Sequence, residues 1–129
     1  MVAEGKTVQT EKARITLSAD GIIYQEYKEN INLTVEDSRK EIGVYSELYQ
    51  GKKRPVLIDI RNVKTVSRES RQFYAGEEPA RFLSAAALII GNPVSRIMGN
   101  FFMGINKTVM PVRLFADPKE AAKWLSDFT

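Results

Sequence analysis

The chain has 129 residues, the size of one ordinary domain, and its composition of 43% hydrophobic and 27% charged residues is typical of a globular protein with a buried core. It contains no cysteine and no histidine, which excludes disulfides, thiolate nucleophiles, imidazole bases and the metal or haem sites that need those ligands; we expect no cofactor and no enzymatic activity. The net charge of +3 is too small a surplus to indicate a nucleic-acid partner.

The sequence shows no targeting or membrane-spanning segment. Residues 1–13 contain no apolar run of the length that a signal peptide needs, and no later stretch approaches the roughly 18 consecutive apolar residues of a transmembrane helix. We therefore expect a cytoplasmic protein without an integral membrane segment. Residues 1–12 are predicted to be a flexible N-terminal segment, and residues 13–129 a single domain.

The first predicted elements are a β-hairpin and a long helix. Residues 13–18 alternate apolar and polar side chains, Asp20-Gly21 favours a turn, and a second strand is predicted over 22–27. Thr34 and Asp37 have the spacing of a capping box, so a helix is predicted over 34–50, before Gly51.

Two strands of buried character follow, with a helix between them. Residues 56–60 form a continuous apolar run that is typical of a strand covered on both faces. Ser67 is a suitable N-cap for a helix that extends to about residue 78, because Pro79 favours its end there. Residues 84–90 are predicted to be a strand that stops at Gly91, although their alanines would suit a helix equally.

The remaining elements repeat the alternation. Asn92 and Pro93 begin a predicted helix over 93–105, residues 112–115 are predicted to be a strand, and residues 117–128 form a last helix. The order is β-β-α-β-α-β-α-β-α. It predicts an α/β fold with a mostly parallel sheet, an antiparallel N-terminal strand and four helices.

Positive charge is concentrated in the middle of the chain, where residues 51–113 carry 11 basic and 4 acidic side chains. Much of it lies in the two loops that follow the buried strands. If the segments near positions 58 and 88 run parallel, both loops lie at one edge of the sheet, where helix N-termini favour anions. The loops are then candidates for binding an acidic group or a protein partner, and the alternative is ordinary helix capping with solvated arginines. The candidate residues are Arg61, Lys64, Ser67, Arg68, Ser70, Arg71, Asn92, Ser95 and Arg96.

Two other features suggest either a structural or a functional role. Phe101, Phe102 and Met103 form an apolar stretch that either contacts a lipid or a second subunit, or packs in the core at the end of a helix. Asp59 lies in an apolar strand, where an unpaired carboxylate is costly, so we expect a hydrogen-bond or cationic partner for it rather than a catalytic role.

Residues 57–70 (LIDIRNVKTVSRES) resemble the central motif of STAS domains, the SpoIIAA-like antagonists of bacterial anti-sigma factors. That motif reads hydrophobic-Asp-hydrophobic-x-x-Val-x-x-hydrophobic-Asp-Ser-Ser-Gly and precedes a helix. The element order is similar over residues 13–128. With residues 84–106, the chain also resembles bacterial single-domain proteins grouped with the STAS and CRAL-TRIO fold.

The resemblance implies a binding module rather than an enzyme, with one departure. The family's phospho-acceptor serine aligns with Glu69, while Ser67 and Ser70 replace the flanking aspartate and glycine. A glutamate cannot accept phosphate, so a kinase-controlled switch would need Ser67 or Ser70 as the acceptor.

Two functions follow as hypotheses. The first is a regulatory module that binds a protein partner, or a second copy of itself, through the loop and helix start at 61–71. The alternative is a protein that binds a lipid or small amphiphile, with an apolar pocket lined by the 97–105 helix and arginines at the head group.

Overall fold

A computed structural model describes residues 5–91 and 108–129. The elements are β1 (Thr7–Gln9), β2 (Ala13–Leu17), β3 (Ile23–Tyr27), β4 (Ile31–Leu33), α1 (Val35–Tyr49), β5 (Arg54–Asp59), β6 (Val63–Val66), α2 (Arg68–Ala75), α3 (Glu77–Ala80), β7 (Leu83–Ile89), β8 (Val112–Phe115), α5 (Pro118–Leu125) and a final 3₁₀ turn (Ser126–Phe128).

The main sheet has six strands in the order β1-β2-β3-β5-β7-β8. The β1–β2 and β2–β3 pairs are antiparallel, and the β3–β5, β5–β7 and β7–β8 pairs are parallel. Ile58 on β5 pairs directly with Leu88 on β7, so the prediction that these two segments run in parallel is confirmed. The mostly parallel sheet with antiparallel N-terminal strands also matches the predicted fold class.

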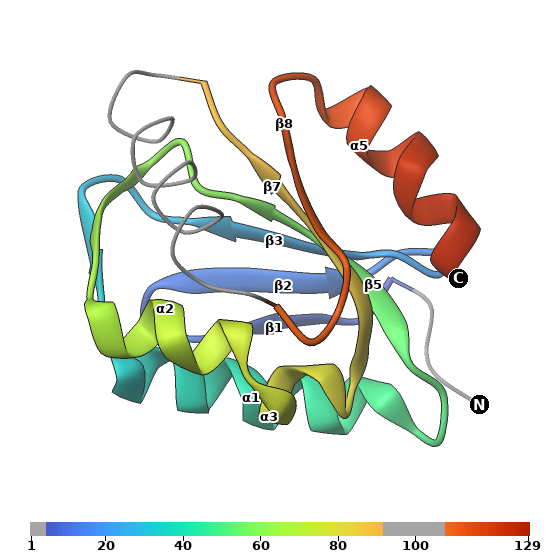
Figure 1. Cartoon of the computed structure of the whole chain (residues 1–129), viewed down its shortest axis with the longest axis horizontal. Helices are drawn as coiled ribbons and strands as arrows, with labels where there is room; N and C mark the ends of the chain where they lie inside the picture. Colours follow the sequence, from blue (N-terminus) through green and yellow to red (C-terminus); the bar gives the residue numbers. More distant parts are fainter. Residues whose placement is uncertain (1–4, 92–107) are drawn as a thin grey trace.

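Helices cover the two faces of the sheet unequally. Figure 1 shows α1, α2 and α3 gathered on one side, while α5 lies on the other. The larger core lies on the first side and contains Ile15, Tyr45 and Ile58; the smaller core under α5 contains Leu57, Ile89 and Leu125. Because successive side chains of a strand point to opposite faces, β5 and β7 contribute to both cores, which explains their continuous apolar sequences.

Helix starts follow the capping chemistry expected from the sequence. Asp37 Oδ2 accepts a hydrogen bond of 2.9 Å from the Thr34 amide, as in a capping box. Ser67 Oγ accepts one of 3.1 Å from the Ser70 amide at the start of α2. Asp117 Oδ1 accepts one of 2.9 Å from the Lys119 amide at the start of α5.

Three expectations need correction. The segment over 1–12, expected to be flexible, contains the edge strand β1, whose only apolar residue, Val8, is half-buried. The loop after β5 contains β6, which pairs in parallel with β4 in a separate two-stranded sheet. The helix predicted over 67–78 is divided at Gly76 into α2 and α3, because the extended backbone there ends the first helix before Pro79 is reached. The helix predicted over 93–105 lies outside the described residues.

Candidate partner-binding site

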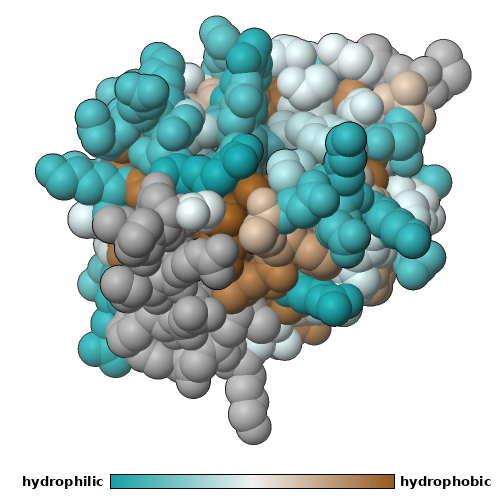
Figure 2. All heavy atoms as spheres, turned by 90° about the horizontal axis from the view of Figure 1, so that it is seen from above, coloured by the Kyte–Doolittle hydropathy of each residue, from teal (hydrophilic) through white to brown (hydrophobic). Residues whose placement is uncertain are grey.

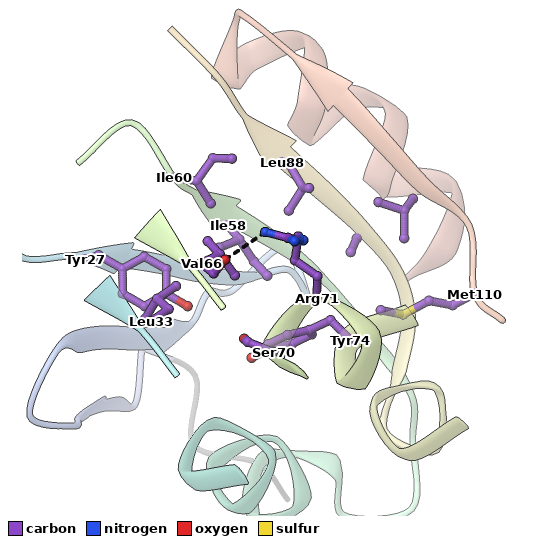
Figure 3. A pocket seen from close by; sticks show the side chains of 12 residues that line it. Tyr27, Leu33, Ile58, Ile60, Val66, Ser70, Arg71, Tyr74, Leu88 and Met110 are labelled. Carbon is purple, nitrogen blue, oxygen red and sulfur yellow. Dashed lines mark hydrogen bonds between the residues drawn. The ribbon is translucent and has the colours of Figure 1, made fainter. Parts of the chain in front are cut away.

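An apolar pocket of about 70 Å³ opens between the sheet and the segment formed by β6 and α2 (Figure 3). Its floor consists of side chains from the strands of the main sheet, among them Ile58 on β5 and Leu88 on β7. Ser70, Arg71 and Tyr74 of α2 form the opposite wall. The remaining lining residues are Tyr27, Leu33, Ile60, Val66, Ala86, Met110 and Val112.

Arg71 brings a positive charge into this apolar surrounding. Its Nη1 donates a hydrogen bond of 2.8 Å to the backbone oxygen of Val66. In Figure 3 the guanidinium extends from α2 over the pocket, toward Ile58 and Leu88. A guanidinium is planar and permanently charged, so one apolar wall of the pocket carries a positive charge.

The surface next to the pocket is also basic. Lys64 on β6 and Arg68 at the start of α2 are both exposed, and with Arg71 they outnumber the single acidic residue nearby in sequence, Glu69. Figure 2, seen from above, shows hydrophobic residues exposed next to hydrophilic ones on this face of the molecule. Residues 63–71 thus combine positive charge with access to an apolar pocket.

The two candidate serines differ in exposure. Ser70 is fully buried, and its Oγ lies 2.5 Å from Oγ of Ser38 on α1. Ser67 is half-buried at the N-cap of α2 and accepts the Ser70 amide. A modifying enzyme would therefore have to detach α2 from α1 before it could reach Ser70, whereas Ser67 lies at the surface.

Arg61 does not belong to the same surface, which corrects the predicted grouping. It lies near Tyr24, Leu57 and Pro118 on the α5 side of the sheet. Successive side chains of a strand point to opposite faces, so Asp59 and Arg61 face the α5 side while Ile58 and Ile60 face the pocket. The intervening strand β6 then carries the chain back to the other side before α2 begins.

Asp59 has the cationic partner that its place in an apolar strand led us to expect. Its carboxylate accepts hydrogen bonds of 2.9 and 2.7 Å from Nε and Nη2 of Arg61, and one of 3.0 Å from the Arg61 amide. Burial acts to raise the pKa of Asp59, but these hydrogen bonds and the positive charge outweigh it and hold the pKa below its ordinary value.

A buried polar cluster that the sequence did not predict lies behind the pocket wall. The carboxylate of Glu41 on α1 accepts hydrogen bonds from Tyr27 on β3, at 2.8 Å, and from Tyr74 on α2. Burial raises the pKa of Glu41 to about 7, although the hydroxyl donors act to lower it. One signal was available: Glu41 falls on the inward stripe of α1 with Tyr45 and Leu48.

The remaining six candidate residues belong to the range 92–107. Asn92, Ser95 and Arg96 of the second loop, and Phe101, Phe102 and Met103 of the apolar stretch, lie outside the described residues. Gly91, the last described residue before that gap, packs on Arg61: a Cβ at Gly91 would lie 2.7 Å from Arg61 Cδ.

Two further structural findings concern residues 5–91 and 108–129. No helix in these ranges is both long and apolar enough to cross a membrane. No group of three or more acidic side chains in these ranges has the arrangement of a metal site.

Comparisons with known proteins identify the fold. A family model described as "Domain of unknown function (DUF7793)" matches residues 15–129. A crystal structure of a protein from Shewanella loihica PV-4, described as a DUF3478 family member with a SpoIIAA-like fold, is 18% identical, covers 93% of this chain and 90% of its own, and has a TM-score of 0.55. A protein from Arthrobacter sp. FB24 described as of unknown function is 26% identical over 92% of this chain and 95% of its own, with a TM-score of 0.35. The comparison with curated proteins gave no match. The fold is SpoIIAA-like, as the sequence predicted.

Proposed function

This chain belongs to the DUF7793 family, and we propose that it is a cytoplasmic, non-enzymatic regulatory module that recognises a protein partner. The recognition surface consists of residues 63–71 and the apolar pocket that they border. This is the surface expected from the sequence at 61–71, without Arg61, which lies on the other side of the sheet.

The observation that carries the proposal is the position of Arg71 at an apolar pocket of about 70 Å³. A pocket of this size accommodates one aliphatic side chain, and small, well-packed pockets of this kind hold the anchor residues of protein interfaces. The guanidinium at the wall and the exposed Lys64 and Arg68 favour an acidic residue next to that anchor. The partner is therefore a protein segment with an acidic residue adjacent to Leu, Ile, Val or Met.

The lipid or amphiphile alternative was predicted for a pocket lined by the 97–105 helix, which lies outside the described residues. The pocket beside Arg71 is small for such a ligand. Pockets for drug-sized ligands are roughly 300–1,000 Å³, several times the volume of this one. An apolar pocket with one cation has the right chemistry for a short carboxylate amphiphile, so decanoate is a suitable probe for this alternative. If the pocket binds a protein segment instead, decanoate added to the protein should leave the NMR signals of Leu88 and Val112 unshifted. A saturable shift of those signals would favour the amphiphile instead.

A library of random 12-residue peptides displayed on phage tests the proposal. Selection on the wild-type protein should enrich sequences that place Asp or Glu within two positions of an aliphatic residue. The selected peptides should lose binding to Arg68→Ala and Arg71→Ala variants, each by about 1.5–3 kcal/mol for a charge-assisted contact. Circular dichroism would verify that both variants keep the wild-type fold.

The matched control is Arg61→Ala, which removes an arginine on the α5 side of the sheet. Its peptide binding should equal that of the wild type. Enriched peptides without acidic residues, or peptides that bind Arg71→Ala as tightly as the wild type, would remove this surface as the recognition site.

A further inference from the structure

Five side chains behind the pocket wall form a closed ring of polar contacts. Gln25 Nε2 donates to Tyr27 Oη at 2.6 Å, and Tyr27 donates to Glu41 Oε2 at 2.8 Å. Tyr74 donates to Glu41 Oε1, and Tyr45 donates to Gln25 Oε1. The ring closes where Tyr45 Oη and Tyr74 Oη lie 3.4 Å apart. It joins β3, α1 and α2.

Counting hydrogens shows that the ring is complete only when Glu41 is protonated. The five contacts need five hydrogens, one for each. The three tyrosines supply one each and the Gln25 amide supplies one, so the fifth must come from the carboxyl group of Glu41. With neutral Glu41, the hydrogen bond to Tyr74 reverses: the carboxyl O–H of Glu41 donates to Tyr74, and Tyr74 donates to Tyr45. Each of the five groups then donates to its neighbour in a single direction around the ring.

Ionised Glu41 leaves one contact without a hydrogen. Its carboxylate attracts the hydroxyl hydrogens of both Tyr27 and Tyr74, while Tyr45 donates to Gln25. Two oxygen atoms, those of Tyr45 and Tyr74, then face each other with no hydrogen between them. That contact is the long one, at 3.4 Å, and it is a direct link from α1 to α2. Ionisation therefore removes the hydrogen from one direct link between α1 and α2.

The charges around the ring do not compensate an ionised Glu41. Its neighbours are the hydroxyls of Tyr27 from β3, Tyr45 from its own helix and Tyr74 from α2, and burial and the nearby negative charge raise the pKa of all three well above the ordinary value. They stay protonated. Among residues 5–91 and 108–129, the charged group that acts on Glu41 is Asp37, also on α1, and its negative charge disfavours ionisation of Glu41.

Asp37 in turn is paired with Lys12, which precedes β2, at 2.8 Å. Glu41 itself is 1% exposed and is buried among aromatic rings. Together these observations describe a carboxyl group that is held in its neutral form by its surroundings and that titrates near neutral pH.

We propose that proton release from Glu41 is a switch that loosens α2 from α1 and thereby changes the pocket wall formed by Tyr74 and Tyr27. Low pH keeps the ring closed and α2 attached; alkaline pH opens it. An effect of the switch on partner binding rests on the proposed function, because Tyr27 and Tyr74 line the pocket proposed to bind the partner. The effect on α2 does not depend on any partner and is tested without one.

Amide hydrogen exchange of the isolated full chain provides that test. Protection factors for the α2 amides, corrected for the intrinsic pH dependence of exchange, should fall by about 30-fold between pH 5.5 and 8. Linkage gives this ratio for a carboxyl group whose pKa is about 7 when α2 is attached and about 4.5 when α2 is detached. Glu41→Gln supplies an amide hydrogen to the ring at every pH and should remove this dependence. Glu47→Gln, an exposed change on the same helix, should keep it.

The carboxyl ¹³C signal of Glu41 is the second measurement, and it needs only the wild-type chain if Glu41→Gln does not fold. It should titrate near pH 7, and Tyr74→Phe should shift the titration upward because it removes a donor to the carboxylate. Titration near pH 4.5, or an equal fall of α2 protection in Glu41→Gln and the wild type, would overturn the switch. Neither result would affect the peptide selection that tests the recognition surface.

Discussion

Ser38 on α1 and Ser70 on α2 place their hydroxyl oxygens 2.5 Å apart in a fully buried contact between the two helices. This contact makes Ser70 part of the packing of α2. The resemblance to SpoIIAA-like proteins raised the question of which serine could replace the family's phospho-acceptor, which aligns with Glu69. Burial makes the Ser70 hydroxyl inaccessible from solvent, whereas Ser67 is half-buried at the N-cap of α2.

Aspartate substitutions at the two serines should have opposite outcomes. Ser70→Asp places an uncompensated charge in the buried contact and should lower the free energy of unfolding by about 3–5 kcal/mol. Ser67→Asp substitutes one good N-cap for another and should change it by less than about 0.5 kcal/mol. Urea denaturation of both variants checks this pair, and equal destabilisation would mean that Ser70 is not buried against Ser38.

Stability should fall as the pH rises from mildly acidic to alkaline. The pKa of Glu41 is raised to about 7, so its contribution is complete below its ordinary pKa near 4.5 and is lost as the pH rises through about 7. The loss is about 3 kcal/mol by linkage. Urea denaturation at pH 5 and pH 8 measures it, and a free energy of unfolding that is constant or higher at pH 8 contradicts the assignment.

Asp37 should determine how the free energy of unfolding falls at acidic pH. Burial acts to raise its pKa, but hydrogen bonds from Lys12 and Thr34 lower it below the ordinary value of 3.8. The stability that Asp37 provides is therefore present above about pH 4 and is lost as the pH falls through its lowered pKa. Asp37→Asn should flatten the acid limb below pH 4 in denaturation curves, while the decline above pH 5 remains. If this variant loses as much free energy of unfolding below pH 4 as the wild type does, other carboxylates cause the loss.

An alanine at position 91 should interfere with Arg61. The added Cβ would lie 2.7 Å from Arg61 Cδ, closer than a real contact allows, so the Arg61 side chain must shift. Because both residues are exposed, Gly91→Ala should lower the free energy of unfolding by at most about 1 kcal/mol. In an Arg61→Ala background the clashing side chain is absent, so Gly91→Ala should lower the free energy of unfolding much less. A double-mutant cycle by thermal or urea denaturation measures this coupling, and additive effects would show that the contact is not formed.

The sequence predicted the central strands because their signals come from the strands themselves. β5 and β7 are covered on both faces, which requires the continuous apolar runs that identified them, and the Ile58–Leu88 pair follows from the order of elements. The helix starts at Thr34, Ser67 and Asp117 were also predictable, because each is capped by one or two side chains that are close in sequence.

The missed features depend on contacts between distant segments. β6 contains the polar pair Lys64-Thr65, and it forms a strand because Val63 and Val66 align with β4. Because β6 intervenes, Arg61 and Arg71 lie on different sides of the sheet, although the sequence predicted them at one edge. The ring around Glu41 combines three elements, and only the position of Glu41 on the inward stripe of α1 pointed to it.

The most direct measurement of the recognition surface is NMR mapping of a selected peptide on the ¹⁵N- and ¹³C-labelled full chain. The peptide, with an acidic residue beside an aliphatic one, should shift the signals of Val66, Arg71 and Leu88 in proportion to occupancy, and those of Tyr24 and Arg61 should remain in place. Saturable shifts confined to Tyr24 and Arg61 would contradict the proposed surface and move the binding site to the α5 side of the sheet.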